Sequence, residues 1–106
     1  MADEQRTPRF EVTAPPELEG GSYANFLSVW HTPFEFTLDF CSTLPARQQE
    51  DGTAVVPCRV VSRVKIPTTM IFDVLRALNE NMTRYEATYG EIRRPQTRSE
   101  PPAGDA

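Results

Sequence analysis

The stretch HTPFEFTLDF, residues 31–40, alternates between apolar and polar side chains almost without a break. Four large apolar side chains share one parity: Phe34, Phe36, Leu38 and Phe40. The other parity carries Glu35, Thr37 and Asp39. Such alternation over this length predicts a β-strand with one buried face. We therefore expect the apolar parity to form the inner face of a sheet.

The two acidic residues of this stretch, Glu35 and Asp39, raise the question of chemistry. Side chains at i and i+4 of a strand share a face but stand about 13 Å apart, whereas paired glycosidase carboxylates need about 5–9.5 Å. Ion pairs with a neighbouring strand fit better, because opposite charges across two strands stabilise a sheet. A polar binding face is the alternative, and Asp39 contacts could lie within one chain or between two subunits.

Two further runs of sequence resemble strands. SYANFLSVW, residues 22–30, is rich in aromatic and β-branched residues, and a turn at Pro33 separates it from the opening stretch. AVVPCRVVSRVKI, residues 54–66, follows a polar loop whose Asp51-Gly52 pair predicts a turn. Pro57 favours an edge position for this third strand. Its basic residues share one parity and are the expected partners of the acidic pair: Arg59, Arg63 and Lys65.

A helix should follow Pro67 and end near Gly90. Its apolar residues recur every three or four positions and form one stripe: Ile71, Leu75, Leu78, Met82, Tyr85 and Tyr89. About twenty helical residues span about 30 Å, which is long enough to cover the strands. The stripe is expected to pack on the sheet of the same chain, with a helix–helix dimer contact as a further use.

These elements predict an α+β fold: an antiparallel three-stranded β-meander packed on one long C-terminal helix, with disordered tails. The sheet would be four-stranded if Phe10 and Val12 added an edge strand. Residues 1–20 are expected to form a flexible N-terminal arm, residues 21–92 a single domain and residues 93–106 a disordered C-terminal tail.

Composition excludes several classes of function. The 106 residues carry a net charge of −4, which argues against nucleic-acid binding. Residues 1–20 lack the apolar core of a secretory signal, and no run approaches the length of a membrane helix, so we expect a cytoplasmic protein. There, Cys41 and Cys58 should remain buried free thiols, although a disulfide between neighbouring strands is conceivable. We expect no metal or cofactor site.

Four residues near the first strand are candidates for binding or interface contacts. Asn25 interrupts an apolar run, so its amide either contacts a partner or makes a structural hydrogen bond at a sheet end. His31 is the single histidine of the chain and lies beside a turn, where a hydrogen-bonding role is more common than catalysis. Phe26 and Trp30 are core or interface aromatics.

The motifs YANF, EFxLDF and ALNENMxRYE, taken in this order over residues 21–92, resemble a family of small prokaryotic proteins catalogued only as a domain of unknown function. That resemblance implies a single domain and a bacterial or archaeal source, and it assigns no activity, ligand or catalytic residue. In layout, with a helix after an antiparallel sheet, the chain is also similar to the SecB-type export chaperones. No motif carries this second likeness.

We therefore expect a non-enzymatic protein–protein interaction or oligomerisation module, most simply a homodimer. The alternative is a chaperone-like or small-ligand-binding protein of SecB-like layout. The residues expected at a binding or subunit interface are Asn25, Phe26, Trp30, His31, Glu35, Asp39, Arg59 and Arg63.

Overall fold

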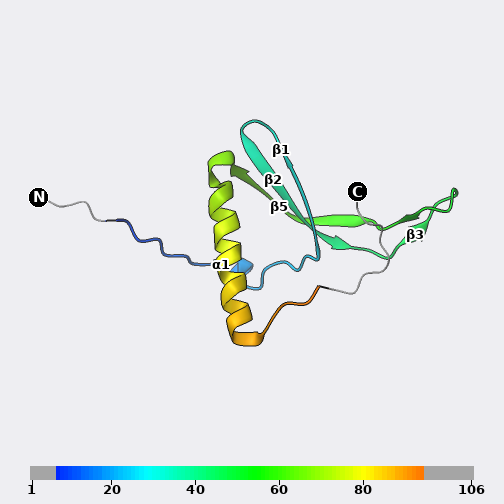
Figure 1. Ribbon diagram of the computed structural model, residues 1–106. Helices are drawn as coiled ribbons and strands as arrows, with labels where there is room; N and C mark the ends of the chain where they lie inside the picture. Colours follow the sequence, from blue (N-terminus) through cyan, green and yellow to red (C-terminus); the bar gives the residue numbers. More distant parts are fainter. Residues whose placement is uncertain (1–6, 95–106) are drawn as a thin grey trace, which may run out of the picture.

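The computed structural model describes residues 7–94, and its main feature is a three-stranded antiparallel sheet followed by one long helix (Figure 1). The sheet has the order β1–β2–β5, with β1 at Phe26–His31, β2 at Glu35–Thr43 and β5 at Cys58–Pro67. The helix α1 runs over Ile71–Tyr89. This arrangement confirms the predicted α+β fold. The tail predictions for residues 1–6 and 95–106 lie outside the described residues.

The segment before β1 does not add a fourth strand to this sheet. Between residue 7 and β1, the only regular element described is the short 3₁₀ helix η1 at Pro16–Leu18. Phe10 and Val12 are almost fully exposed and pair with no strand. Prolines lie on both sides of this short segment and lack the N–H that pairing with a strand requires. The predicted alternative of a four-stranded main sheet is therefore wrong.

The turn between β1 and β2 lies where the sequence predicted it. Thr32 N–H donates to the carbonyl of Glu35 at 3.0 Å, and Pro33 occupies the turn between them. Phe34 also lies in this turn and is exposed. The apolar face of β2 therefore begins at Phe36.

The predicted polar loop contains a second, small sheet. Strand β3 at Arg47–Gln48 pairs antiparallel with β4 at Ala54–Val55. Asp51 and Gly52 form the turn as predicted: Gly52 has φ 88°, and Asp51 Oδ1 accepts the Thr53 N–H at 2.9 Å. The single strand predicted over residues 54–66 is wrong, because the chain leaves the ladder at Pro57, which lacks an N–H.

Strand β5 is an edge of the main sheet, as predicted, and it contains an irregularity that the sequence did not reveal. Phe40 lies opposite Ser62, whereas Cys41 lies opposite Val60, so Val61 is an extra residue in the ladder. A bulge of this kind reverses the facing of the residues before it. Arg59 consequently lies opposite Ser42 and does not share a face with the basic residues beyond the bulge.

The helix begins and ends near its predicted limits. A 3₁₀ turn, η2 at Thr68–Met70, follows Pro67 and leads into α1. At the other end, Gly90 has φ 100° and donates its N–H to the carbonyl of Glu86 at 3.0 Å. Because this φ lies in the region that residues with a Cβ avoid, glycine is the residue that suits this position.

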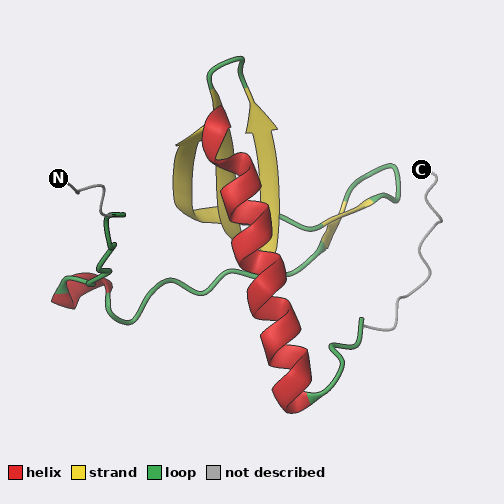
Figure 2. Ribbon diagram, turned by 60° about the vertical axis from the view of Figure 1, so that its left-hand side comes forward, coloured by secondary structure: helices red, strands yellow, loops and turns green. Residues whose placement is uncertain are grey.

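The helix is poorly covered by its own chain. No residue of α1 is buried, and Leu75 and Leu78 are 57% and 65% exposed. Figure 2 shows α1 in front of the sheet, and in Figures 1 and 2 its C-terminal half extends beyond the strands. The prediction that the whole stripe packs on the sheet of the same chain is therefore wrong, since its half-buried apolar residues, Ile71 and Val74, lie near the start of α1.

Replacement of Gly90 by alanine is expected to lower the free energy of unfolding by about 1 kcal/mol, because alanine is strained at a positive φ. Gly20→Ala is the matched control, since Gly20 has no positive φ and a Cβ added there would meet no atom within 4 Å. Thermal unfolding followed by circular dichroism measures both. Equal stability of the two variants would contradict this role for Gly90.

Candidate functional site

The register of the sheet divides its side chains into two faces of different chemistry. Val29, Leu38 and Val64 form one row across the three strands, and Ser28, Asp39 and Arg63 form the next row on the opposite face. We call the first the apolar sheet face; its members are Leu27, Val29, His31, Phe36, Leu38, Phe40, Val64 and the buried Ile66. We call the second the polar sheet face; its members are Trp30, Glu35, Thr37, Asp39, Arg63 and Lys65.

Asp39 lies at the centre of the polar sheet face and is 5% exposed. Arg63 donates two hydrogen bonds to it, from Nε to Oδ1 at 2.7 Å and from Nη2 to Oδ2 at 2.8 Å. Trp30 Nε1 donates to the same Oδ2 at 3.4 Å. The carboxylate is thus held by a bidentate ion pair, the strongest geometry for these two groups. The predicted cross-strand pairing of Asp39 is confirmed, and it lies within one chain.

This environment lowers the pKa of Asp39 below its ordinary value of 3.8. The Arg63 hydrogen bonds are the largest cause, and burial of the carboxyl opposes them. The Trp30 hydrogen bond and the charges of Arg63 and Lys65 lower the pKa further. Asp39 is therefore a charged structural group at neutral pH, and a lowered pKa is the opposite of what a general acid requires.

Lys65 occupies the neighbouring row and completes the cluster. Its ammonium donates to Thr37 Oγ1 at 2.9 Å, lies 3.6 Å from Glu35 Oε2, and stands 4.9 Å from the centre of the Trp30 ring. The Arg63 guanidinium carbon lies 5.8 Å from the same ring. Two cationic groups, those of Lys65 and Arg63, thus lie near the Trp30 ring on the polar sheet face, where cation–π attraction is favourable. The predicted pairing of Glu35 with a basic residue of the third strand is also confirmed.

The burial on β2 is the reverse of the sequence prediction. Thr37, Asp39 and Cys41 are buried, whereas the apolar parity is only half-buried. The long side chains of Trp30, Arg63 and Lys65 cover the polar parity, and α1 leaves the apolar parity partly open. The expectation that the apolar parity forms a closed core against the helix is wrong for the single chain.

The other predicted site residues lie apart from this cluster. Asn25 is at the sheet end, where its Oδ1 accepts the Thr43 N–H at 3.0 Å and its Nδ2 donates to Thr43 Oγ1 at 3.2 Å. This geometry gives Asn25 the structural hydrogen bonds that were one of its two predicted roles. Phe26 lies opposite Cys41, and His31 lies beside the Phe36 ring at 5.7 Å on the apolar side.

Sequence reasoning named Lys65 as a partner of the acidic pair and placed Thr37 on the polar parity, but it missed the row that these two residues form with Trp30. Thr37 is fully buried, and Lys65 lies against the Trp30 ring. Both share the row of Trp30, because Trp30 lies opposite Thr37 and Thr37 lies opposite Lys65. An antiparallel register drawn out from the Pro33 turn would have placed these three side chains together.

Both cysteines are free thiols, as expected, but they differ in burial. Cys41 is buried and Cys58 is exposed, so the prediction of two buried thiols is wrong for Cys58. Burial is the main cause that raises the pKa of Cys41 above its ordinary value, with the nearby Cys58 and Asp39 adding to it. A raised pKa keeps Cys41 protonated and unreactive at neutral pH.

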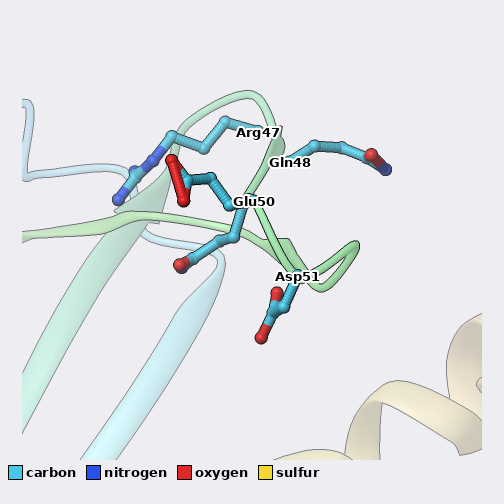
Figure 3. A pocket seen from close by; sticks show the side chains of 5 residues that line it. Arg47, Gln48, Glu50 and Asp51 are labelled. Atoms are coloured by element: carbon cyan, nitrogen blue, oxygen red, sulfur yellow. The ribbon is translucent and has the colours of Figure 1, made fainter.

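Figure 3 shows a hollow beside the β3–β4 hairpin, lined by Arg47, Gln48, Gln49, Glu50 and Asp51. Every one of these residues is exposed. In the view, Arg47 and Gln48 point in different directions, away from one another. The hollow lacks the apolar lining and converging polar groups that are typical of a ligand site. Across residues 7–94, no three histidine, cysteine or acidic side chains gather closely enough to hold a metal ion.

Comparison with known proteins gives one family. The family model described as "Protein of unknown function (DUF3467)" matches residues 1–94, which is most of the chain. No curated protein and no solved structure matches it. Of the helices in the described part, none has the length and apolar character needed to cross a membrane.

Asp39→Asn is expected to lower the midpoint of thermal unfolding at pH 7 by about 5 °C or more, because the neutral amide leaves Arg63 without its charged partner. A carboxyl with a lowered pKa stabilises the fold fully above its unfolded-state value of 3.8 and loses this contribution as the pH falls through its lower folded-state pKa. The difference between the variant and the wild type should therefore shrink below about pH 4.

The control for this prediction is Asp73→Asn on α1. Asp73 also accepts a hydrogen bond from an arginine, Arg76, at 2.8 Å, but the side chains of this pair are 64% and 61% exposed. Exposed pairs contribute little, so this variant should unfold within about 2 °C of the wild type. Equal losses in the two variants would contradict a special role for the Asp39–Arg63 pair.

Proposed function

The chain belongs to the family described as "Protein of unknown function (DUF3467)", and from this premise we propose that it is a non-enzymatic protein–protein interaction module that self-associates as a homodimer. The observation that carries the proposal is the apolar stripe of α1, which is exposed along most of the helix in a single chain. The stripe consists of Ile71, Leu75, Leu78, Met82, Tyr85 and Tyr89.

The first support is the energetics of the helix. Helices of globular proteins gain most of their stability from packing an apolar face, and an isolated helix of this length is marginal in water. Within its own chain, the apolar side chains of α1 are half-buried only near its start, at Ile71 and Val74. A second subunit that covered the rest of the stripe would supply the missing packing.

The second support is the amount of apolar surface left open. A stable interface removes about 800 Å² from each partner. A large aliphatic or aromatic side chain can bury on the order of 100–200 Å². The α1 stripe and the apolar sheet face together hold about a dozen such side chains. Many of them are at least 40% exposed, including Leu27, Leu78 and Met82, so two copies have enough surface to reach this size.

The third support concerns the groups that could have carried an enzymatic reaction. Asp39 is occupied by Arg63 and Trp30, and its acidic neighbour on the same face, Glu35, lies beside Lys65. Cys41 is buried with a raised pKa. His31 lies on the other face of the sheet, beside Phe36. These groups do not converge on a common reacting atom, which is what a catalytic site requires.

Light scattering coupled to size-exclusion chromatography tests the proposal. The wild type should elute with twice the chain mass of 12.0 kDa at micromolar concentration. Leu78→Glu should weaken self-association by at least about tenfold, because a carboxylate would have to be buried at the contact. In a single chain the same change is mild, since Leu78 is 65% exposed. At concentrations at which the variant is still a dimer, its far-ultraviolet spectrum should therefore keep the helical signal.

Ala87→Glu introduces the same charge on the opposite side of α1 and is the control, for which no change in mass is expected. A monomeric wild type would contradict self-association. If that monomer instead held unfolded polypeptides in solution, and Leu78→Glu abolished the effect, the chaperone-like alternative would replace the homodimer.

A further inference from the structure

Besides the apolar sheet face, the outer edge of β1 also has no partner within the described chain. In the described chain, β1 pairs with β2 on one side only, and all six of its residues are exposed. We infer that the β1 edges of two copies pair antiparallel about a two-fold axis at Val29, which joins two three-stranded sheets into one of six strands. The inference rests on the proposed homodimer and specifies how its two subunits meet.

The backbone groups available at this edge follow from the turn. Thr32 donates its N–H to Glu35 across the hairpin, so Thr32 directs its backbone groups toward β2. Such groups alternate along an antiparallel strand. The backbone N–H and C=O groups of Ser28 and Trp30 therefore also point toward β2. Those of Leu27, Val29 and His31 point away from β2, toward the open edge of the sheet. Within residues 7–94, no backbone hydrogen bond involves the outward N–H and C=O groups of these three residues.

The two edges of the sheet differ in the features that prevent strand pairing. Strand β5 has the bulge at Val61, the charged side chains of Arg63 and Lys65, and a proline at its end. Bulges, charges and prolines are the usual means by which proteins block an edge. Strand β1, with the sequence FLSVWH, has no aspartate, glutamate, lysine or arginine, no proline and an unbroken register with β2. Of the two edges, β1 is therefore the one open to another strand.

The register of the pairing follows from the three outward residues. Leu27, Val29 and His31 are placed symmetrically about Val29, so an axis at Val29 is the register that uses all of them. Val29 then faces Val29 of the partner, Leu27 faces His31 of the partner, and about six backbone hydrogen bonds form. All of these side chains lie on the apolar sheet face, which becomes continuous across both subunits.

Two observations favour a second copy of this chain as the occupant. The strand is self-complementary, because the antiparallel pairing about Val29 places no like charges opposite one another. A peptide on the edge would bury only the strand, which falls short of the roughly 800 Å² of a stable interface. A second copy also brings its own apolar sheet face, with Leu27 and Val29 about half exposed.

Disulfide trapping tests the register with a matched pair of variants. Val29 and Val64 lie in the same row, on either side of Leu38, at opposite edges of the sheet, and are 49% and 41% exposed. Each is replaced by cysteine in a Cys58→Ser background, so that the buried Cys41 is the only native thiol left. Paired positions in antiparallel strands lie about 5.5 Å apart, within the range of a disulfide.

Under mild oxidation at micromolar concentration, most of the Val29→Cys protein should run as a dimer on a non-reducing gel, at least about tenfold more than Val64→Cys. Val29→Lys should give a monomeric mass by light scattering, because two lysines would face one another at the axis. Its far-ultraviolet spectrum should keep the signal of the sheet.

The outcomes separate this inference from the proposed function. A dimeric wild type in which Val29→Cys is not trapped, or is trapped no better than Val64→Cys, would overturn the β1 pairing and leave the homodimer intact. A folded Val29→Lys variant that remains a dimer would overturn it as well. A monomeric wild type would overturn both proposals, and addition of a foreign peptide strand at β1 would then be the remaining use of the edge.

Discussion

A carboxylate buried in the middle strand of a small sheet has to be neutralised, and the ion pair of Asp39 with Arg63 meets this requirement. Burying an unpaired charge would cost more than a domain of this size can offset. Arg63 lies directly opposite Asp39 in the register, so the pair also fixes the alignment of β2 with β5. A slip by one residue would move every side chain of the strand to the other face and separate the two charges.

The consequence of this pairing is a sheet with one closed face and one open face. The polar sheet face is complete within one chain, because Trp30, Arg63 and Lys65 cover Thr37 and Asp39 and satisfy their polar atoms. The apolar sheet face is covered less completely: Ile66 is buried, but Phe36, Leu38 and Phe40 are only half-buried. The C-terminal half of α1 extends beyond the strands and does not cover them. The apolar stripe of the helix and the apolar face of the sheet are thus both left open, and the proposed homodimer is the simplest way to close them.

Sequence patterns predicted the elements of this fold better than their packing. Periodicity identified the strands and the helix, and local chemistry identified the turns at Pro33, Asp51 and Gly52 and the helix end at Gly90. The bulge at Val61 could not be foreseen, because Val60 and Val61 are identical neighbours and no local signal marks either as the extra residue. The bulge removed Arg59 from the expected charge cluster. The β3–β4 hairpin was missed because its strands have only two residues each. The prediction of which side of β2 is buried was wrong because the apolar side chains were assumed to face inward. The long side chains of the neighbouring strands instead cover the polar side chains of β2.

In the proposed homodimer, a second copy of the chain covers α1 and the β1 edge. Hydrogen–deuterium exchange of the intact protein, followed by mass spectrometry over a range of protein concentrations, tests it most directly. Peptides from α1 and β1 should exchange slowly at high protein concentration and faster on dilution, while the exchange of peptides from β2, the middle strand, should not change. Fast exchange of α1 at every concentration, with β2 protected throughout, would contradict it.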